Sequence, residues 1–119
     1  MKSFTDISQS KTLAKILPIE SADMRYSPLG DNMHPWVWTD TFIEKDAIPC
    51  WSLAALLSVI PKRIKVHNVL RIDISDDDFA IWYDEIGFGV NSDLPDITIE
   101  EPIDACVEMI IKLKEKGLM

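Results

Sequence analysis

The sequence predicts an α+β fold in which a small antiparallel sheet packs against about three helices. Three observations predict it: an uncharged apolar stretch between two prolines at residues 48–61, alternating apolar and polar residues at 69–84, and an apolar stripe at helical spacing from residue 102 onward. Strands flanked by helices are typical of helices on one face of an antiparallel sheet. We therefore expect the order α-ββ-α-ββ-α, in a single domain over residues 1–119.

The N-terminal part predicts a helix followed by a short hairpin. The helix should run from about Thr5, as its N-cap, to Leu17, since Pro18 follows. Residues 24–26 and 36–39 should form two strands joined through a turn at 27–32. Pro35 favours an edge position for the second strand, because proline cannot donate a hydrogen bond to a sheet.

Residues 49–60 predict the central helix, a buried element on which the others pack. Pro49 suits a first helical position, where its missing N–H costs nothing, and Pro61 ends the helix. Lys62, Arg63 and Lys65 follow, which is typical of a solvated helix end that suits the helix dipole.

The C-terminal half predicts an antiparallel hairpin and a final helix. The hairpin covers residues 69–84 with a turn at Asp76–Asp78, and short strands are expected at 87–90 and 97–99. The helix should run from Pro102 to about Lys116, with Glu101 as its cap residue and Glu108 and Lys112 as an i,i+4 ion pair on it.

Charge distribution argues against nucleic-acid binding. The net charge is −8, and residues 69–119 hold 4 basic against 13 acidic side chains, whereas residues 1–68 hold 8 against 7. Binding to phosphates needs clustered lysine and arginine. The longest apolar run is too short to span a bilayer, and the first residues lack an apolar signal region. We expect a cytoplasmic protein with no membrane contact and no cofactor.

Two tryptophans are the best candidates for a contact surface. Trp36 and Trp38 should share one face of a probable edge strand, where aromatic side chains can stack on a ligand or a partner chain. The alternative is that both simply cover one side of the sheet, since large aromatics are highly buried on average.

Other residues capable of chemistry do not assemble into a recognisable motif. The carboxylates of Asp73 and Asp76–Asp78 form the densest acidic cluster, but the glycine of a calcium loop is absent. Cys50-Trp51 is similar to the Cys-Trp step of papain-like proteases over those two residues alone, so we expect Cys50 and Cys106 to be buried free thiols.

Two stretches carry a resemblance. Residues 48–57, closing with Ile60-Pro61-Lys62, and residues 101–110 are similar to segments of small uncharacterised proteins of Bacteroides-type gut bacteria, which are often phage- or mobile-element-like. Glu101 stands where those proteins commonly have asparagine. That group has no established activity, so the resemblance implies fold and origin only.

These observations favour a small non-enzymatic binding or accessory protein that acts through protein contact, and the resemblance favours a phage or mobile-element origin. The alternative is a hydrolase or metal-binding protein with a site built from residues distant in sequence, namely His67, Asp73, Asp76 and Asp78. A cleft that gathers these four side chains would favour the alternative.

Overall fold

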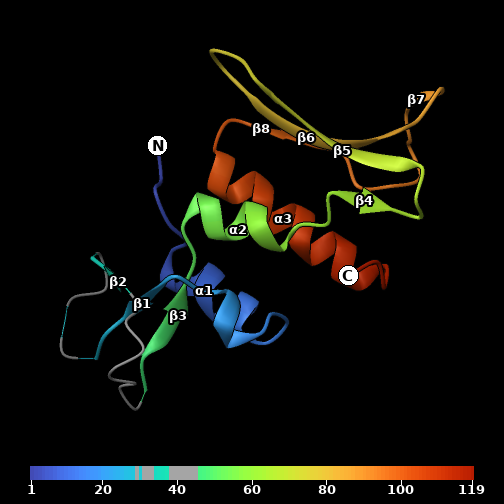
Figure 1. Cartoon of the computed structure of the whole chain (residues 1–119). Helices are drawn as coiled ribbons and strands as arrows, with labels where there is room; N and C mark the ends of the chain where they lie inside the picture. The colour runs from blue at the N-terminus through green and yellow to red at the C-terminus, as the bar shows by residue number, and fades with distance from the viewer. Residues whose placement is uncertain (29, 31–33, 38–45) are drawn as a thin grey trace. The chain divides into compact units, whose positions relative to one another are not determined.

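The computed structural model describes residues 1–28, 30, 34–37 and 46–119. Three α-helices and two antiparallel sheets of three and five strands are present in these residues, which confirms the α+β class (Figure 1). The chain divides into two compact units, residues 2–59 and residues 60–119 together with Met1. The single domain stays a prediction, because compactness does not say whether either unit folds alone.

The helix α1, Ile7–Ala14, is shorter than expected and begins after a different cap. Asp6, not Thr5, is the N-cap: its carboxylate accepts from the N–H of Gln9 at 2.8 Å, and the Gln9 side chain accepts from the N–H of Asp6 at 3.1 Å. This reciprocal pair satisfies two donors that a helix start leaves unpaired. Thr5 is instead fully buried.

The small sheet of residues 2–59 has the order β2-β1-β3. The strands β1, Met24–Tyr26, and β2, Trp36–Val37, are antiparallel, which confirms the predicted hairpin and the edge position of its second strand. The strand β3, Ile48–Cys50, pairs with the other side of β1, so that Met24 lies opposite Cys50.

The central helix predicted at 49–60 is wrong in its first four residues. Residues 48–50 form β3, and the helix α2 covers only Leu53–Val59. Trp51 is held in the sheet region by Thr5, whose N–H donates to the Trp51 carbonyl at 2.9 Å. The hydroxyl of Ser52 accepts from the N–H of Ala55 at 3.2 Å, the contact of an N-cap residue. A short 3-10 helix, Ile19–Ser21, also lies in this unit.

Residues 60–119 hold the larger sheet, with the order β4-β5-β6-β7 and with β8 also paired to β6. The predicted hairpin is confirmed as β5, Asn68–Ile74, and β6, Phe79–Glu85. The expected short strands are β7, Gly89–Val90, and β8, Ile97–Ile99. The strand β4, Arg63–Ile64, was not predicted: these residues were expected to follow a helix end.

The helix α3, Pro102–Glu115, lies along one face of this sheet and contacts β6 and β8 (Figure 1). Its bounds agree with the prediction, Pro102 occupies the first turn, and the Glu108–Lys112 ion pair forms at 3.4 Å. Alternate residues of β6 point to the helix: Phe79, Ile81 and Tyr83 are at most 2% exposed. Within the described residues no helix is both long and apolar enough to cross a membrane.

Candidate functional site

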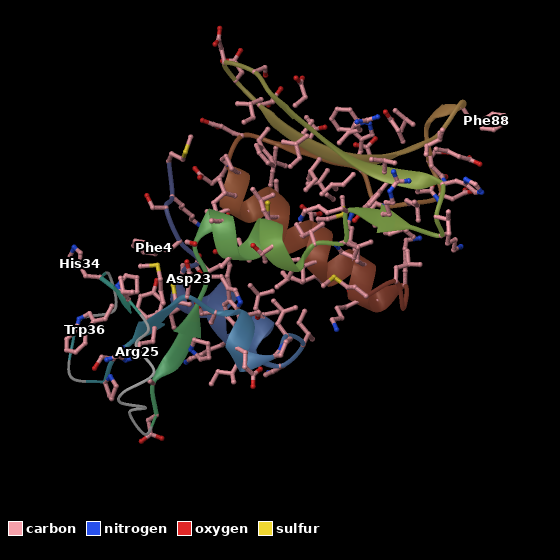
Figure 2. All side chains as sticks on the ribbon, viewed as in Figure 1. Phe4, Asp23, Arg25, His34, Trp36 and Phe88 are labelled. Carbon is pink, nitrogen blue, oxygen red and sulfur yellow. The ribbon has the colours of Figure 1, made fainter. Side chains whose placement is uncertain are left out.

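Trp36, one of the two predicted contact residues, lies on the edge strand β2 with 45% of its surface exposed (Figure 2). The guanidinium of Arg25 lies 5.4 Å from the centroid of the indole, a cation–π distance. A Cβ on Gly30 would come within 3.3 Å of the indole Nε1, so the ring lies against the backbone there. Trp38 lies outside the described residues.

Arg25 anchors this edge. The residue is 5% exposed, and its Nη1 donates to the carbonyl of Val37 at 3.2 Å. This hydrogen bond from a β1 side chain to the β2 backbone adds to the pairing of the two strands. The Trp36 indole covers the guanidinium. One face of the indole is therefore used inside the unit, and what stays exposed is a smaller surface than a free tryptophan would offer.

The residues named for a hydrolytic or metal site are not brought together. His67 precedes β5 and the Asp76–Asp78 turn follows it, so the two lie at opposite ends of that strand. A seven-residue strand separates its ends by roughly 20 Å. No group of three histidine, cysteine or carboxylate side chains with the spacing of a metal site occurs in the part of the chain that the structure describes.

The acidic turn itself is an ordinary hairpin turn. The N–H of Ser75 donates to the carbonyl of Asp78 at 2.9 Å, and the N–H of Asp78 donates to the Ser75 hydroxyl at 3.1 Å. Asp76 and Asp77 occupy the two positions between them and are exposed. Their charges are therefore solvated, although the turn borders a pocket described below.

Cys50 is a buried structural thiol, though it lies in a strand and not in a helix. The thiol is fully buried and donates to the carbonyl of Thr5 at 3.4 Å. Burial raises the pKa of Cys50, and hydrogen bonds from Thr5, Ser10 and Tyr26 oppose that rise only in part. Because these neighbours are neutral hydroxyls and none is a base, the arrangement cannot generate a thiolate nucleophile.

Cys106 is the second buried free thiol, as predicted. It is fully buried on α3, and burial raises its pKa to about 12, with an opposing effect from Lys62. A thiol protonated over the whole neutral range is inert.

Sequence reasoning missed a group of exposed apolar side chains at two neighbouring turns. We call this group the apolar tip; its members and exposed fractions are Val66 71%, Ile86 53%, Phe88 83% and Val90 57%. The N–H of Ile86 donates to the carbonyl of His67 at 2.8 Å, so the β4–β5 turn lies beside the β6–β7 turn. Phe88 projects outward from the end of the sheet (Figure 2).

The two turns of the apolar tip have unusual backbones. Lys65 and Val66 both have positive φ, 51° and 67°, and the N–H of His67 donates to the Lys65 carbonyl at 2.7 Å around Val66. A positive φ in a β-branched residue is a strained conformation, and such strain often occurs at functional sites. Phe88 lies between Gly87 and Gly89, which supply the positive φ of the other turn. A phenylalanine between two glycines is the sequence signal that could have revealed this surface.

Two shallow pockets also occur in residues 60–119. The first, about 200 Å³, lies between the acidic turn and the start of α3. The second, about 320 Å³, lies near Lys65, Asn91 and Lys116. Three of its polar side chains are hydrogen-bonded: Asn91 donates to the side chain of Asn68 at 2.9 Å, and Lys116 donates to the carbonyl of Asp93 at 3.4 Å.

Comparison of the chain with protein-family models, with curated proteins and with solved structures gives no match.

Proposed function

We propose that this chain is a small non-enzymatic binding protein that acts by contact with another protein, and that the apolar tip is its main contact surface. The observation that carries the proposal is the exposure of Phe88 and its neighbours at two adjacent turns. The resemblance of residues 48–62 and 101–110 to phage- or mobile-element-like proteins supports an accessory role.

The apolar tip has the chemical character of an interaction site. Exposed apolar residues that occur singly are normal, but a group of them marks a surface that becomes buried in a complex. An aromatic side chain offers a large contact area and loses little conformational entropy when it is buried in a complex. Aromatic residues therefore contribute much of the binding free energy at interfaces. The hydrogen bond between Ile86 and His67 holds both turns in place, so the tip is preorganised for docking.

Lack of a catalytic arrangement supports the same proposal. The two thiols are buried and protonated, and the acidic turn and His67 lie at opposite ends of β5. Neither pocket contains a nucleophile paired with a base among the described residues. A protein partner is favoured over a nucleic acid because of the net charge of −8.

The experiment expresses in the source cell a variant of the chain that carries the photo-reactive residue benzoylphenylalanine at position 88. We expect a discrete cross-linked product with one partner protein. Phe88→Ser, tested by co-purification with that partner, should lower recovery about tenfold, the usual loss at a contact that dominates an interface.

Ile19→Ser is the matched control, because Ile19 is also a large exposed apolar residue, at 49%, but lies outside the tip. It should leave recovery of the partner unchanged. Full recovery with Phe88→Ser, or an equal loss with both variants, would contradict the proposal. Both variants should melt within a few degrees of the wild-type chain, since surface substitutions change stability little.

A further inference from the structure

The edge of β5 that faces away from β6 is paired with β4 over only a few residues and is open beyond them. The strand β4 pairs with β5 only opposite Asn68 and Val69, and one further bond joins the Leu70 N–H to the Lys62 carbonyl at 2.9 Å. Among the described residues, no strand pairs with β5 on this side from Arg71 to Ile74. Unpaired strand edges are templates for another extended chain.

The direction of the backbone groups follows from two hydrogen bonds at the ends of this stretch. Leu70 bonds outward to β4, whereas Ser75 bonds inward to Asp78 across the hairpin. Because backbone groups alternate sides along a strand, Ile72 and Ile74 direct their N–H and C=O groups to the open edge. Two residues of β5 therefore offer hydrogen-bonding groups that the rest of the sheet leaves unused.

The cover that β4 gives to β5 ends at Leu70. Lys62 directs its carbonyl to Leu70, so by the same alternation Pro61 points its backbone groups away from β5, and Ile60 would be the next residue to face it. The Pro61 carbonyl instead accepts from the Tyr83 hydroxyl at 2.6 Å. Among the described residues, Ile60 is not paired with β5, so the edge stays open beyond Leu70.

Side chains on the open edge are apolar and exposed. Ile72 is 40% and Ile74 is 74% exposed, although both lie on the same face as the buried Ile81 and Phe79 opposite them. A strand added beside β5 would lay its alternate side chains next to these two isoleucines. Burial of this apolar surface would stabilise the added strand.

The edge leads into the pocket of about 200 Å³ at the acidic turn. Met1, Ile74, Phe79 and Pro102 form the apolar part of its lining. The remainder is Ser75 and five carboxylate residues: Asp76, Asp77, Asp78, Glu100 and Glu101. A lining that combines apolar side chains with carboxylates matches the chemistry of a lysine or arginine side chain, which has an apolar stem and a charged end.

Charge on the opposite face of β5 points to the same kind of ligand. Arg71 is already paired with Asp84 at 3.3 Å, whereas Asp73 is exposed on the same face. A basic residue on an added strand would find Asp73 beside it and the acidic turn beyond it. Electrostatic complementarity of this kind selects partners and fixes their register.

A second copy of this chain fits the edge poorly. Antiparallel self-pairing centred on Ile72 would place Ile74 of one copy opposite Leu70 of the other, a position that Lys62 already occupies. Pairing centred on Asp73 would set two like charges directly opposite each other, which is destabilising. The acidic turn of each copy adds to this repulsion.

We infer that the open edge of β5 over residues 71–74 binds an extended, basic segment of a partner protein by strand addition, with a lysine or arginine of that segment in the acidic pocket. Backbone hydrogen bonds to Ile72 and Ile74 supply affinity, and the pocket supplies selectivity for the basic side chain. The ligand is a segment of a protein, as the proposed function requires. The surface that binds it is separate from the apolar tip.

The test uses the whole chain and a blocked peptide of about six residues that alternates lysine with valine, the usual length of one strand. Titration is followed by amide resonances and by hydrogen exchange. We expect the Ile72 and Ile74 amides to become protected on binding. The Leu70 amide is the internal reference, because its N–H is already bonded to Lys62.

Two altered peptides separate strand addition from simple charge attraction. Replacing lysine by glutamate should abolish binding, because the pocket lining is acidic. Methylating the peptide's backbone nitrogens keeps the charge but removes its N–H donors, and should weaken binding about tenfold. Equal binding of the methylated peptide, or unprotected Ile72 and Ile74 amides at saturation, would overturn the inference.

Asp77→Lys tests the pocket, and Glu115→Lys is its control. Both variants change the net charge equally, but Glu115 is the last residue of α3, far from the pocket at the helix start. Asp77→Lys should weaken binding of the lysine peptide about tenfold, and Glu115→Lys less than about threefold. An equal loss in both variants would show attraction to net charge alone and overturn the inference.

The two proposals fail separately. Phe88→Ser should leave peptide binding at the β5 edge unchanged, and Asp77→Lys should leave the cross-link at position 88 unchanged. Loss of peptide binding with an intact cross-link overturns only the strand-addition site, and the reverse result overturns only the apolar tip.

Discussion

The Tyr83 hydroxyl donates to the carbonyl of Pro61 at 2.6 Å, across 22 positions of the sequence. Tyr83 is fully buried on β6, whereas Pro61 lies immediately before the residues that cover β5. One hydrogen bond therefore connects the core of the larger sheet to the place where β4 begins and the open edge of β5 is defined.

Tyr83→Phe should loosen this connection. The substitution removes the hydroxyl and keeps the ring, so we expect the free energy of unfolding to fall by about 1 kcal/mol. The Leu70 amide should also exchange faster, because its acceptor Lys62 follows Pro61. Urea unfolding and hydrogen exchange measure the two effects.

Tyr26→Phe is the control for that prediction. The Tyr26 hydroxyl donates to the Thr5 carbonyl at 2.6 Å, within the other unit. This variant should lose similar stability without faster exchange at Leu70. Unchanged exchange at Leu70 in Tyr83→Phe would contradict the role given to the Tyr83–Pro61 bond.

Thr5 is the centre of a buried polar network, and its replacement should be costly. The Thr5 hydroxyl bonds to Ser10 at 2.8 Å and accepts from the N–H of Trp51 at 3.1 Å. Thr5→Val keeps the shape but removes the acceptor of the Trp51 N–H and one partner of the Ser10 hydroxyl in the core. We expect a loss of about 2 kcal/mol in the free energy of unfolding, measured with urea.

Thr12→Val is the matched control, because the Thr12 hydroxyl donates to the Ser8 carbonyl at 3.1 Å on the exposed side of α1. It should change stability by less than about 0.5 kcal/mol. Similar losses in the two variants would mean that the buried network around Thr5 adds no more to the free energy of unfolding than an exposed hydrogen bond does.

Elements held by interactions between residues close in sequence were predicted well, and elements held by distant residues were not. The hairpin β5–β6 and the helix α3 were predicted with nearly their observed bounds, because each depends on local periodicity. The strand at Ile48–Cys50 was read as helix, since what holds it is β1 and Thr5, more than 20 residues away. Long-range pairing of this kind leaves no local pattern.

The candidate surfaces show the same division. Trp36 lies on an edge strand, as predicted, and is half exposed, while its role as a contact residue stays a prediction. The apolar tip was missed because apolar residues near a strand pattern are normally assigned to the core. The open edge of β5 could not be predicted, since it depends on where β4 stops, and β4 has only two residues.

Removal of the N-cap of α1 should destabilise the chain by about 1 kcal/mol. Asp6→Ala loses the bond to the Gln9 N–H, whereas Asp6→Ser keeps a capping oxygen and should recover most of the loss. Burial alone would raise the pKa of Asp6, but the Gln9 N–H and Lys2 outweigh it and lower that pKa.

The pH dependence of this variant has a definite sign. A carboxyl whose pKa is lowered by folding stabilises the folded state above its ordinary value of 3.8 and loses that effect as the pH falls through the lowered pKa. The difference between wild type and Asp6→Ala should therefore shrink in acid. A difference that grows as the pH falls would contradict the assigned cap.

Alkaline pH should destabilise the folded chain through its buried thiols and phenols. Burial raises the pKa values of Cys50, Tyr26 and Tyr83 above their ordinary 9.0 and 10.0, and that of Cys106 to about 12. The unfolded chain ionises these groups first, so unfolding releases protons once the pH exceeds about 9. These groups leave stability unchanged below that pH and lower it progressively above.

Urea midpoints measured from about pH 8 to about pH 11 test this prediction, and Cys106→Ala is the control. That variant starts from lower stability, because a buried sulfur is lost, but its stability should decline less steeply with rising pH. The reason is that one of the groups that ionise only in the unfolded chain has been removed. A midpoint that rises above pH 9, or an identical decline in the variant, would contradict the burial of an un-ionised Cys106 thiol on α3.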